Sequence, residues 1–80
     1  MKVGWMWFDN DPNRTIEEKV RRAAEKYRAK FGRFPNTCYV NQAAIAESET
    51  KVGRVKVIGA PNILPHHFWL GVHQAKPKGA

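Results

Sequence analysis

Cysteine and long apolar runs are both scarce in this sequence. The 80 residues include one cysteine, Cys38, so no intramolecular disulfide can form and we expect a reducing compartment. The apolar stretch from Val3 to Phe8 ends at Asp9, and it is far shorter than the roughly 20 residues of a membrane-spanning helix. It is also shorter than the apolar region of a secretory signal. These absences predict a soluble, cytoplasmic protein with no membrane contact.

Motifs of common enzymes are missing as well. The sequence contains no Gly-rich phosphate loop, no C-x-x-C pair and no H-E-x-x-H motif. None of its few serines and threonines lies in a strand-to-helix elbow, where a nucleophile would be exposed. Cys38 lies in a strand-like stretch, where a lone cysteine is usually a small buried apolar residue. The sequence therefore identifies no catalytic residue and no cofactor, and it favours a non-enzymatic protein, although missing motifs do not by themselves exclude an enzyme.

Acidic residues are half as frequent as basic ones. The chain has 14 Lys and Arg against 7 Asp and Glu, a formal charge of +7, and a pI near 10.0. Such an excess on a small domain creates a positive field that attracts polyanions, of which nucleic acid is the commonest in a cell. Charge alone does not separate nucleic-acid binding from simple solubility.

Length and aromatic content bound the architecture. A chain of 80 residues forms one domain, and such a domain buries only about 60–65% of the surface of its unfolded chain. Three Trp, two Tyr and four Phe supply enough apolar surface for a core without disulfides. We expect one compact domain over residues 1–73, followed by a flexible polar tail over residues 74–80.

The clearest predicted element is a helix over residues 16–31. Thr15 and Glu18 fit a capping box at its start, and Gly32 fits a left-handed cap at its end. Apolar residues recur at helical spacing along one stripe: Ile16, Val20, Ala23, Ala24, Tyr27 and Phe31. An acidic first turn and basic last turns suit the helix dipole.

Four further stretches have the composition of strands, and they are residues 3–8, 37–41, 52–59 and 66–72. Residues 42–50 predict a helical turn or short helix. The order β-α-β-(short α)-β-β predicts an α+β fold, with a small mixed sheet of about four strands and one long helix on one face. The first two strands should be parallel through a right-handed crossover, and the last two antiparallel. The second face of the sheet must then be solvated, ligand-bound or paired with a second copy.

All three histidines lie in the stretch PNILPHHFWLGVH, residues 61–73. Side chains alternate along a strand, so one face holds His66, Phe68, Leu70 and Val72, which predicts the core. The other face holds His67, Trp69, Gly71 and His73. His67 and His73 would lie about 20 Å apart along the strand, too far to bind one metal together. His67 and Trp69 are either a partly exposed pair without function or rings that stack on a base or contact a partner.

The stretch FDNDPNRT resembles part of a calcium loop, with Asp9, Asp11 and Asn13 at alternate positions. An EF-hand would need Gly at the sixth position and Glu at the twelfth, where this chain has Arg14 and Val20. Asx-type hydrogen bonds that lead into the helix are the simpler interpretation. A weak Mg²⁺ or Ca²⁺ site at Asp9 and Asp11 is the alternative. Together with His67, it would support a metal-assisted hydrolase, the least supported hypothesis.

One flank of the predicted helix is basic. At about 100° per residue, this flank carries a row with no acidic residue inside it, made of Lys19, Arg22, Lys26 and Lys30 and followed by Arg33. Arg54 and Lys56 would extend the row if the sheet edge lies close. The row is either a solvated face with i,i+4 pairs such as Arg21–Glu25 or a surface that contacts phosphates.

Three stretches also carry a resemblance to other proteins. The pattern W-x-W/F-D-x-D before the helix, and then GRFPNTCYVN and LPHHFWLGV, resemble small uncharacterised open reading frames of bacteria and mobile elements. The resemblance covers most of the chain. It implies no activity, cofactor or catalytic residue.

Two functional hypotheses follow from the sequence. The first is a small non-enzymatic module that binds nucleic acid or another polyanion through the basic helix face, Lys19, Arg22, Lys26, Lys30 and Arg33. The alternative is an interaction or accessory protein. It would bind another protein, or a second copy of itself as a homodimer, through an aromatic sheet face that includes His67 and Trp69.

Overall fold

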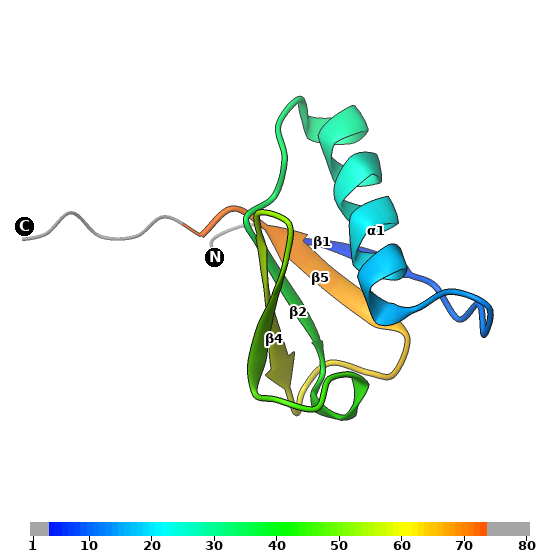
Figure 1. The fold of residues 1–80 in the computed structure, drawn as a ribbon. Helices are drawn as coiled ribbons and strands as arrows, with labels where there is room; N and C mark the ends of the chain where they lie inside the picture. Colours follow the sequence, from blue (N-terminus) through cyan, green and yellow to red (C-terminus); the bar gives the residue numbers. More distant parts are fainter. Residues whose placement is uncertain (1–3, 74–80) are drawn as a thin grey trace, which may run out of the picture.

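Five strands and one long helix make up the fold in the computed structural model, which describes residues 4–73 (Figure 1). The strands are β1 (Gly4–Phe8), β2 (Thr37–Asn41), β3 (Glu49–Val52), β4 (Val55–Ala60) and β5 (His67–Gly71). The helix α1 spans Ile16–Phe31, and a short 3-10 helix η1 spans Gln42–Ala44. The predicted α+β class is confirmed, but the sheet has five strands rather than about four. The predicted tail over residues 74–80 lies outside the described residues.

The additional strand arises because residues 52–59, predicted to be a single strand, belong to a hairpin of β3 and β4. Gly53, with a φ of 59°, and Arg54 form a two-residue turn that lets Val52 pair with Val55. Such turns need positive φ, which glycine adopts without steric penalty. Residues 42–50 were predicted to be helical, but only Gln42–Ala44 is, and the stretch already enters β3 at Glu49.

The sheet order is β1-β5-β2-β4-β3. β5 lies between β1 and β2 and is antiparallel to both, while β2 and β4 are parallel and β3 is antiparallel to β4. β1 and β2 therefore run in the same direction, as predicted, although they are not neighbours. β4 and β5 run in opposite directions with β2 between them. β1 and β3 are the two edges of the described sheet.

α1 begins and ends at the predicted residues because both of its caps form. The Thr15 Oγ1 atom accepts a hydrogen bond of 3.2 Å from the Glu18 N–H, and the Thr15 N–H donates to Glu18 Oε1 at 3.1 Å. Gly32 has a φ of 80° and donates its N–H to the Arg28 carbonyl. Within residues 4–73, no helix combines the length and apolar character that crossing a membrane requires.

The core lies between α1 and one face of the sheet. From the helix it contains Val20, Ala23, Ala24 and Tyr27, and from the strands Cys38, Val40, Val52, Val55, Val57, Phe68 and Leu70. Trp5 and Trp7 of β1 pack at its margin. Phe31 ends the apolar stripe and is 43% exposed, and its ring contacts those of Tyr27 and Trp5.

β5 divides its side chains between two faces as predicted. Phe68 and Leu70 are buried under α1, while His67 and Trp69 are half-buried on the opposite face. His66 was predicted to share the core face, and that prediction is wrong. It precedes the strand with a φ of 65°, is exposed, and accepts a hydrogen bond of 3.0 Å from the Asp9 N–H through its carbonyl.

Gly4 provides a test of how Trp69 packs. A Cβ atom on Gly4 would lie 2.0 Å from Cε2 of the Trp69 indole. Gly4→Ala should therefore displace the ring and lower the free energy of unfolding by about 1–3 kcal/mol, measured by chemical denaturation. In a Trp69→Ala background the same substitution should have a much smaller effect, because the opposing ring is gone. Equal destabilisation in both backgrounds would contradict this packing.

Candidate functional site

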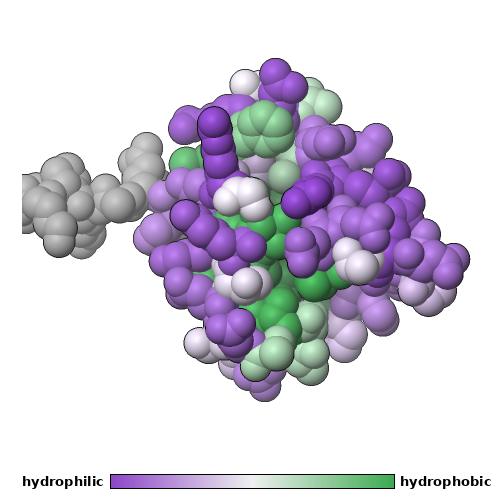
Figure 2. All heavy atoms as spheres, viewed as in Figure 1, coloured by the Kyte–Doolittle hydropathy of each residue, from purple (hydrophilic) through white to green (hydrophobic). Residues whose placement is uncertain are grey.

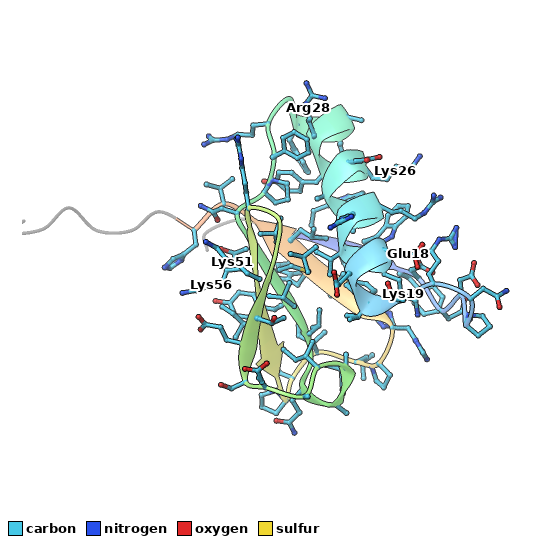
Figure 3. All side chains as sticks on the ribbon, viewed as in Figure 1. Glu18, Lys19, Lys26, Arg28, Lys51 and Lys56 are labelled. Atoms are coloured by element: carbon cyan, nitrogen blue, oxygen red, sulfur yellow. The ribbon has the colours of Figure 1, made fainter. Side chains whose placement is uncertain are left out.

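The basic row of α1, defined as Lys19, Arg22, Lys26, Lys30 and Arg33, lies on one flank of the helix and just beyond its C-terminus. All of its members are exposed except Lys19, which is half-buried. Figure 3 shows Lys19 and Lys26 on the side of the helix that is turned away from Lys51 and Lys56.

No member of the basic row is neutralised by an acidic side chain in the part of the chain that is described. The ion pairs found among residues 4–73 are Arg14–Asp11 and Lys56–Glu49, and neither involves α1. The expected Arg21–Glu25 pair is not formed. The members of the row thus form no ion pair among residues 4–73, although Lys19 lies close enough to Asp11 to help lower the pKa of that carboxyl.

The row does not continue onto the sheet. Arg54 lines a hollow together with Arg21 and Glu25, on the opposite flank of α1. Lys56 alternates with the buried Val55 and Val57, so it lies on the face of the sheet away from the helix, where it pairs with Glu49 at 3.5 Å. The condition for extending the row through Arg54 and Lys56 is therefore not met.

Lys19 and His67 both line one hollow, although the His67 ring packs beside Phe8 on the opposite face of the sheet. This hollow of about 210 Å³ lies at the N-terminal end of α1 and is lined by Ile16, Lys19, Val40, Asn41, Ala44, His66, His67 and Phe68. Nδ1 of His67 lies 2.8 Å from the Pro65 carbonyl oxygen. A carbonyl only accepts, so Nδ1 carries a proton.

Asp9 and Asp11 form Asx-type turns. Oδ1 of Asp9 accepts a hydrogen bond from the Asp11 N–H at 3.0 Å, and Oδ1 of Asp11 accepts one from the Asn13 N–H at 2.8 Å. The Asn13 N–H, and after it the paired Arg14, lower the pKa of Asp11 below 3.8. Among residues 4–73, no three His, Cys, Asp or Glu side chains form a group that could hold a metal. This geometry gives the hydrolase hypothesis no support.

Among residues 4–73, no helix covers the face of the sheet away from α1. Direct cross-strand pairing places Met6, Trp69, Tyr39 and Ile58 side by side across β1, β5, β2 and β4, and we call them the apolar row. Phe8 pairs with His67 beside it, and their ring centroids are 5.0 Å apart. The ring neighbour of His67 is therefore Phe8, whereas Trp69 lies over Gly4.

Tyr39 and Met6 were not among the predicted site residues. Tyr39 is half-buried between the buried Cys38 and Val40, and this alternation is the signal that places its side chain opposite the core. Met6 alternates in the same way between Trp5 and Trp7, but an all-apolar strand hides the pattern.

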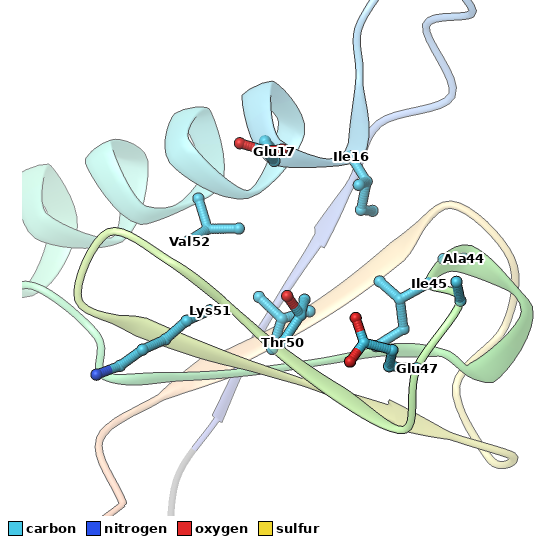
Figure 4. Close-up of a pocket in the computed structure, with 10 residues that line it drawn as sticks. Ile16, Glu17, Ala44, Ile45, Glu47, Thr50, Lys51 and Val52 are labelled. Atoms are coloured by element: carbon cyan, nitrogen blue, oxygen red, sulfur yellow. The ribbon is translucent and has the colours of Figure 1, made fainter.

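One helix leaves part of its own side of the sheet uncovered. A groove separates α1 from the β3–β4 hairpin, and Figure 2 shows hydrophobic side chains at the centre of this view between hydrophilic ones. The groove contains hollows of about 270 and 410 Å³. Glu17 and Glu47 line the first (Figure 4), and Glu25 lines the second. Lys51 also lines the first hollow, and Arg21 and Arg54 line the second, so the groove carries charges of both signs.

Comparison with known proteins supplies no relative. No protein-family model matches the chain, and neither a curated protein nor a solved structure matches it significantly. The candidate surfaces are therefore the basic row of α1 and the open sheet face with the apolar row.

The thiol of Cys38 should be inert in the folded protein. Cys38 is 0% exposed, and burial raises the pKa of its thiol from 9.0 to about 12. The reactive thiolate is thus scarce. We expect no alkylation by iodoacetamide under native, mildly alkaline conditions and rapid alkylation in denaturant, measured by mass spectrometry. Comparable rates in the two conditions would contradict the burial of Cys38.

The same pKa shift predicts a pH dependence of stability. The folded state keeps a thiol proton that the unfolded state loses, so the contribution of Cys38 is complete below pH 9.0 and falls as pH rises toward about 12. A Cys38→Val variant should lack this part of the decline.

Proposed function

We propose that this protein is a small, non-enzymatic module that binds nucleic acid or another polyanion, and that the basic row of α1 contacts the phosphates. The proposal rests on the observation that these basic side chains form no ion pair among residues 4–73. Arg22, Lys26 and Lys30 are exposed, and the ion pairs found among residues 4–73 lie elsewhere.

The scaffold holds these charges in a fixed arrangement. α1 is capped at both ends and is anchored through buried residues on the sheet. Row members three and four residues apart stand one above another along the helix, about one turn of 5.4 Å apart. A rigid row of cations loses little backbone entropy on binding, which favours it over charges on a mobile loop.

The net charge acts at longer range. A formal charge of +7 on 80 residues attracts a polyanion before contact and speeds association at low ionic strength. Contacts to phosphates release condensed counterions, so the affinity should fall steeply as salt increases.

Charge reversal within the row tests the proposal. Arg22→Glu combined with Lys26→Glu should weaken binding of a labelled oligonucleotide at least about tenfold at low salt, and reduce the slope of log affinity against log salt by about 2. Fluorescence anisotropy measures both quantities. The matched control is Arg21→Glu combined with Arg54→Glu, which changes the net charge equally but on the other side of the helix. If both double variants lose affinity equally, the row is not the binding surface.

A second candidate is a protein–protein interaction module that uses β1 and the open sheet face. The edge strand β1 contains no charged residue and no proline, whereas the other edge strand, β3, carries Glu49 and Lys51. Edge strands without such protection tend to pair with other strands. Met6 and Phe8 of β1 are 43% and 53% exposed. Two copies would each carry a formal charge of +7, which opposes self-pairing and ranks this candidate second.

Self-association should appear in sedimentation velocity, and it should increase with salt as the repulsion is screened. Phe8→Lys would place a charge on the β1 edge and should shift a dimer to monomer without unfolding the protein. Leu64→Lys is the matched control, because Leu64 is 66% exposed and lies outside the strands. A wild-type chain that stays monomeric at high concentration and high salt would eliminate self-association through β1.

A further inference from the structure

The indole of Trp69 lies against the open face of the sheet. A Cβ on Gly4 would meet Cε2 at 2.0 Å, Nε1 at 2.2 Å and Cζ2 at 2.4 Å. The Nε1–Cε2–Cζ2 edge of the indole therefore lies against the backbone of β1 at Gly4. Trp69 is half-buried, so part of its side chain is accessible.

A hollow adjoins this ring. It has a volume of about 490 Å³ and is lined by Met6, Tyr39, Ala60, Asn62, Ile63 and Trp69. Asn41 fixes its wall, because its side-chain Nδ2 donates a hydrogen bond of 2.8 Å to the carbonyl of the buried Ile63. The size and the combination of aromatic walls with a few polar groups are typical of sites for small planar ligands.

The polar groups and charges around the hollow suit a nucleobase. The Tyr39 hydroxyl and the Asn62 amide supply hydrogen-bond donors and acceptors next to an aromatic face. Among the described strand residues of this face, Glu49 is the acidic one, and it is already paired with Lys56. A face without free carboxylates on a chain of charge +7 favours a polyanion over a second, equally charged copy.

We propose that this hollow binds an unpaired nucleobase stacked on Trp69, so that the preferred ligand of the protein is single-stranded nucleic acid. This inference rests on the proposed function and names its ligand class. In a duplex both faces of each base are covered by neighbouring bases, whereas in a single strand they can stack on an aromatic side chain.

β1 is an edge strand that contributes side chains to both faces of the sheet, and a single strand would pass around this edge to reach both surfaces. Trp5 of β1 faces α1, where its ring contacts those of Tyr27 and Phe31, while the next residue, Met6, lines the hollow. The basic row thus holds phosphates on one side of this edge strand, and the hollow receives a base on the other.

The first experiment compares a labelled single-stranded DNA oligomer with an abasic oligomer of equal length, by fluorescence anisotropy at physiological salt. Wild-type protein should bind the abasic strand about tenfold more weakly or worse, because stacking is lost. Trp69→Ala should weaken binding of the normal strand to the abasic level and leave binding of the abasic strand unchanged. Phe8→Ala, which removes an exposed aromatic ring outside the hollow, should change neither affinity.

A second experiment uses the wild-type chain, because loss of the Trp69 ring can itself disturb packing over Gly4. A single strand containing 5-iodouracil is irradiated with the protein, and the crosslinked peptide is identified by mass spectrometry. We expect crosslinks to Trp69 or Tyr39. Crosslinks confined to α1 would overturn the inference.

The outcomes separate this inference from the proposed function. If wild-type protein binds both oligomers equally and the Arg22→Glu, Lys26→Glu variant binds neither, the nucleobase site is overturned and the basic row stands. If neither oligomer binds at any salt concentration, both proposals fail. A wild-type dimer that Trp69→Ala dissociates would assign this face to a second copy and would also overturn the inference.

Discussion

Packing of α1 against β5 determines where every surface of this protein lies. Val20 and Ala23 of the helix are buried in the same core as Phe68 and Leu70 of β5, and β5 is second in the sheet order β1-β5-β2-β4-β3. A helix about 10 Å wide cannot cover five strands that lie about 4.8 Å apart. It therefore leaves a groove beside the β3–β4 hairpin. In the part of the chain that the structure describes, the opposite face of the sheet has no helix over it.

The parts of the fold that depend on neighbouring residues could be predicted from the sequence. Thr15 with Glu18 at one end and Gly32 with Arg28 at the other define α1 through contacts between residues three or four apart, so its bounds were predicted correctly. The hairpin was missed because Val52, Val55 and Val57 look like one strand, and Gly53 alone marks the turn. The strand order could not be predicted, because insertion of β5 depends on pairing between distant residues and has no local signature.

The candidate surfaces, too, were predicted where they depend on residues close in sequence and missed where they depend on distant ones. The basic row was predicted because helical spacing alone brings its members together, and Trp69 was placed opposite the core by alternation along one strand. The hollow was not predicted, because Met6, Tyr39 and Asn62 come from two strands and a loop. They meet only through the pairing of Met6 and Tyr39 with Trp69 on β5.

The position of β5 between β1 and β2 also controls the order in which the chain can fold. During synthesis β1, α1 and β2 emerge first, but among the described strands β1 pairs only with β5. Until residues 67–71 are made, the apolar stripe of α1 lacks Phe68 and Leu70 as packing partners. The core must then close late and through contacts between distant parts of the chain, which makes folding slow and cooperative. Loss of β5 would separate β1 from the rest of the sheet and remove Phe68 and Leu70 from the core, so a shortened chain would expose its apolar strands and aggregate rather than form a smaller domain.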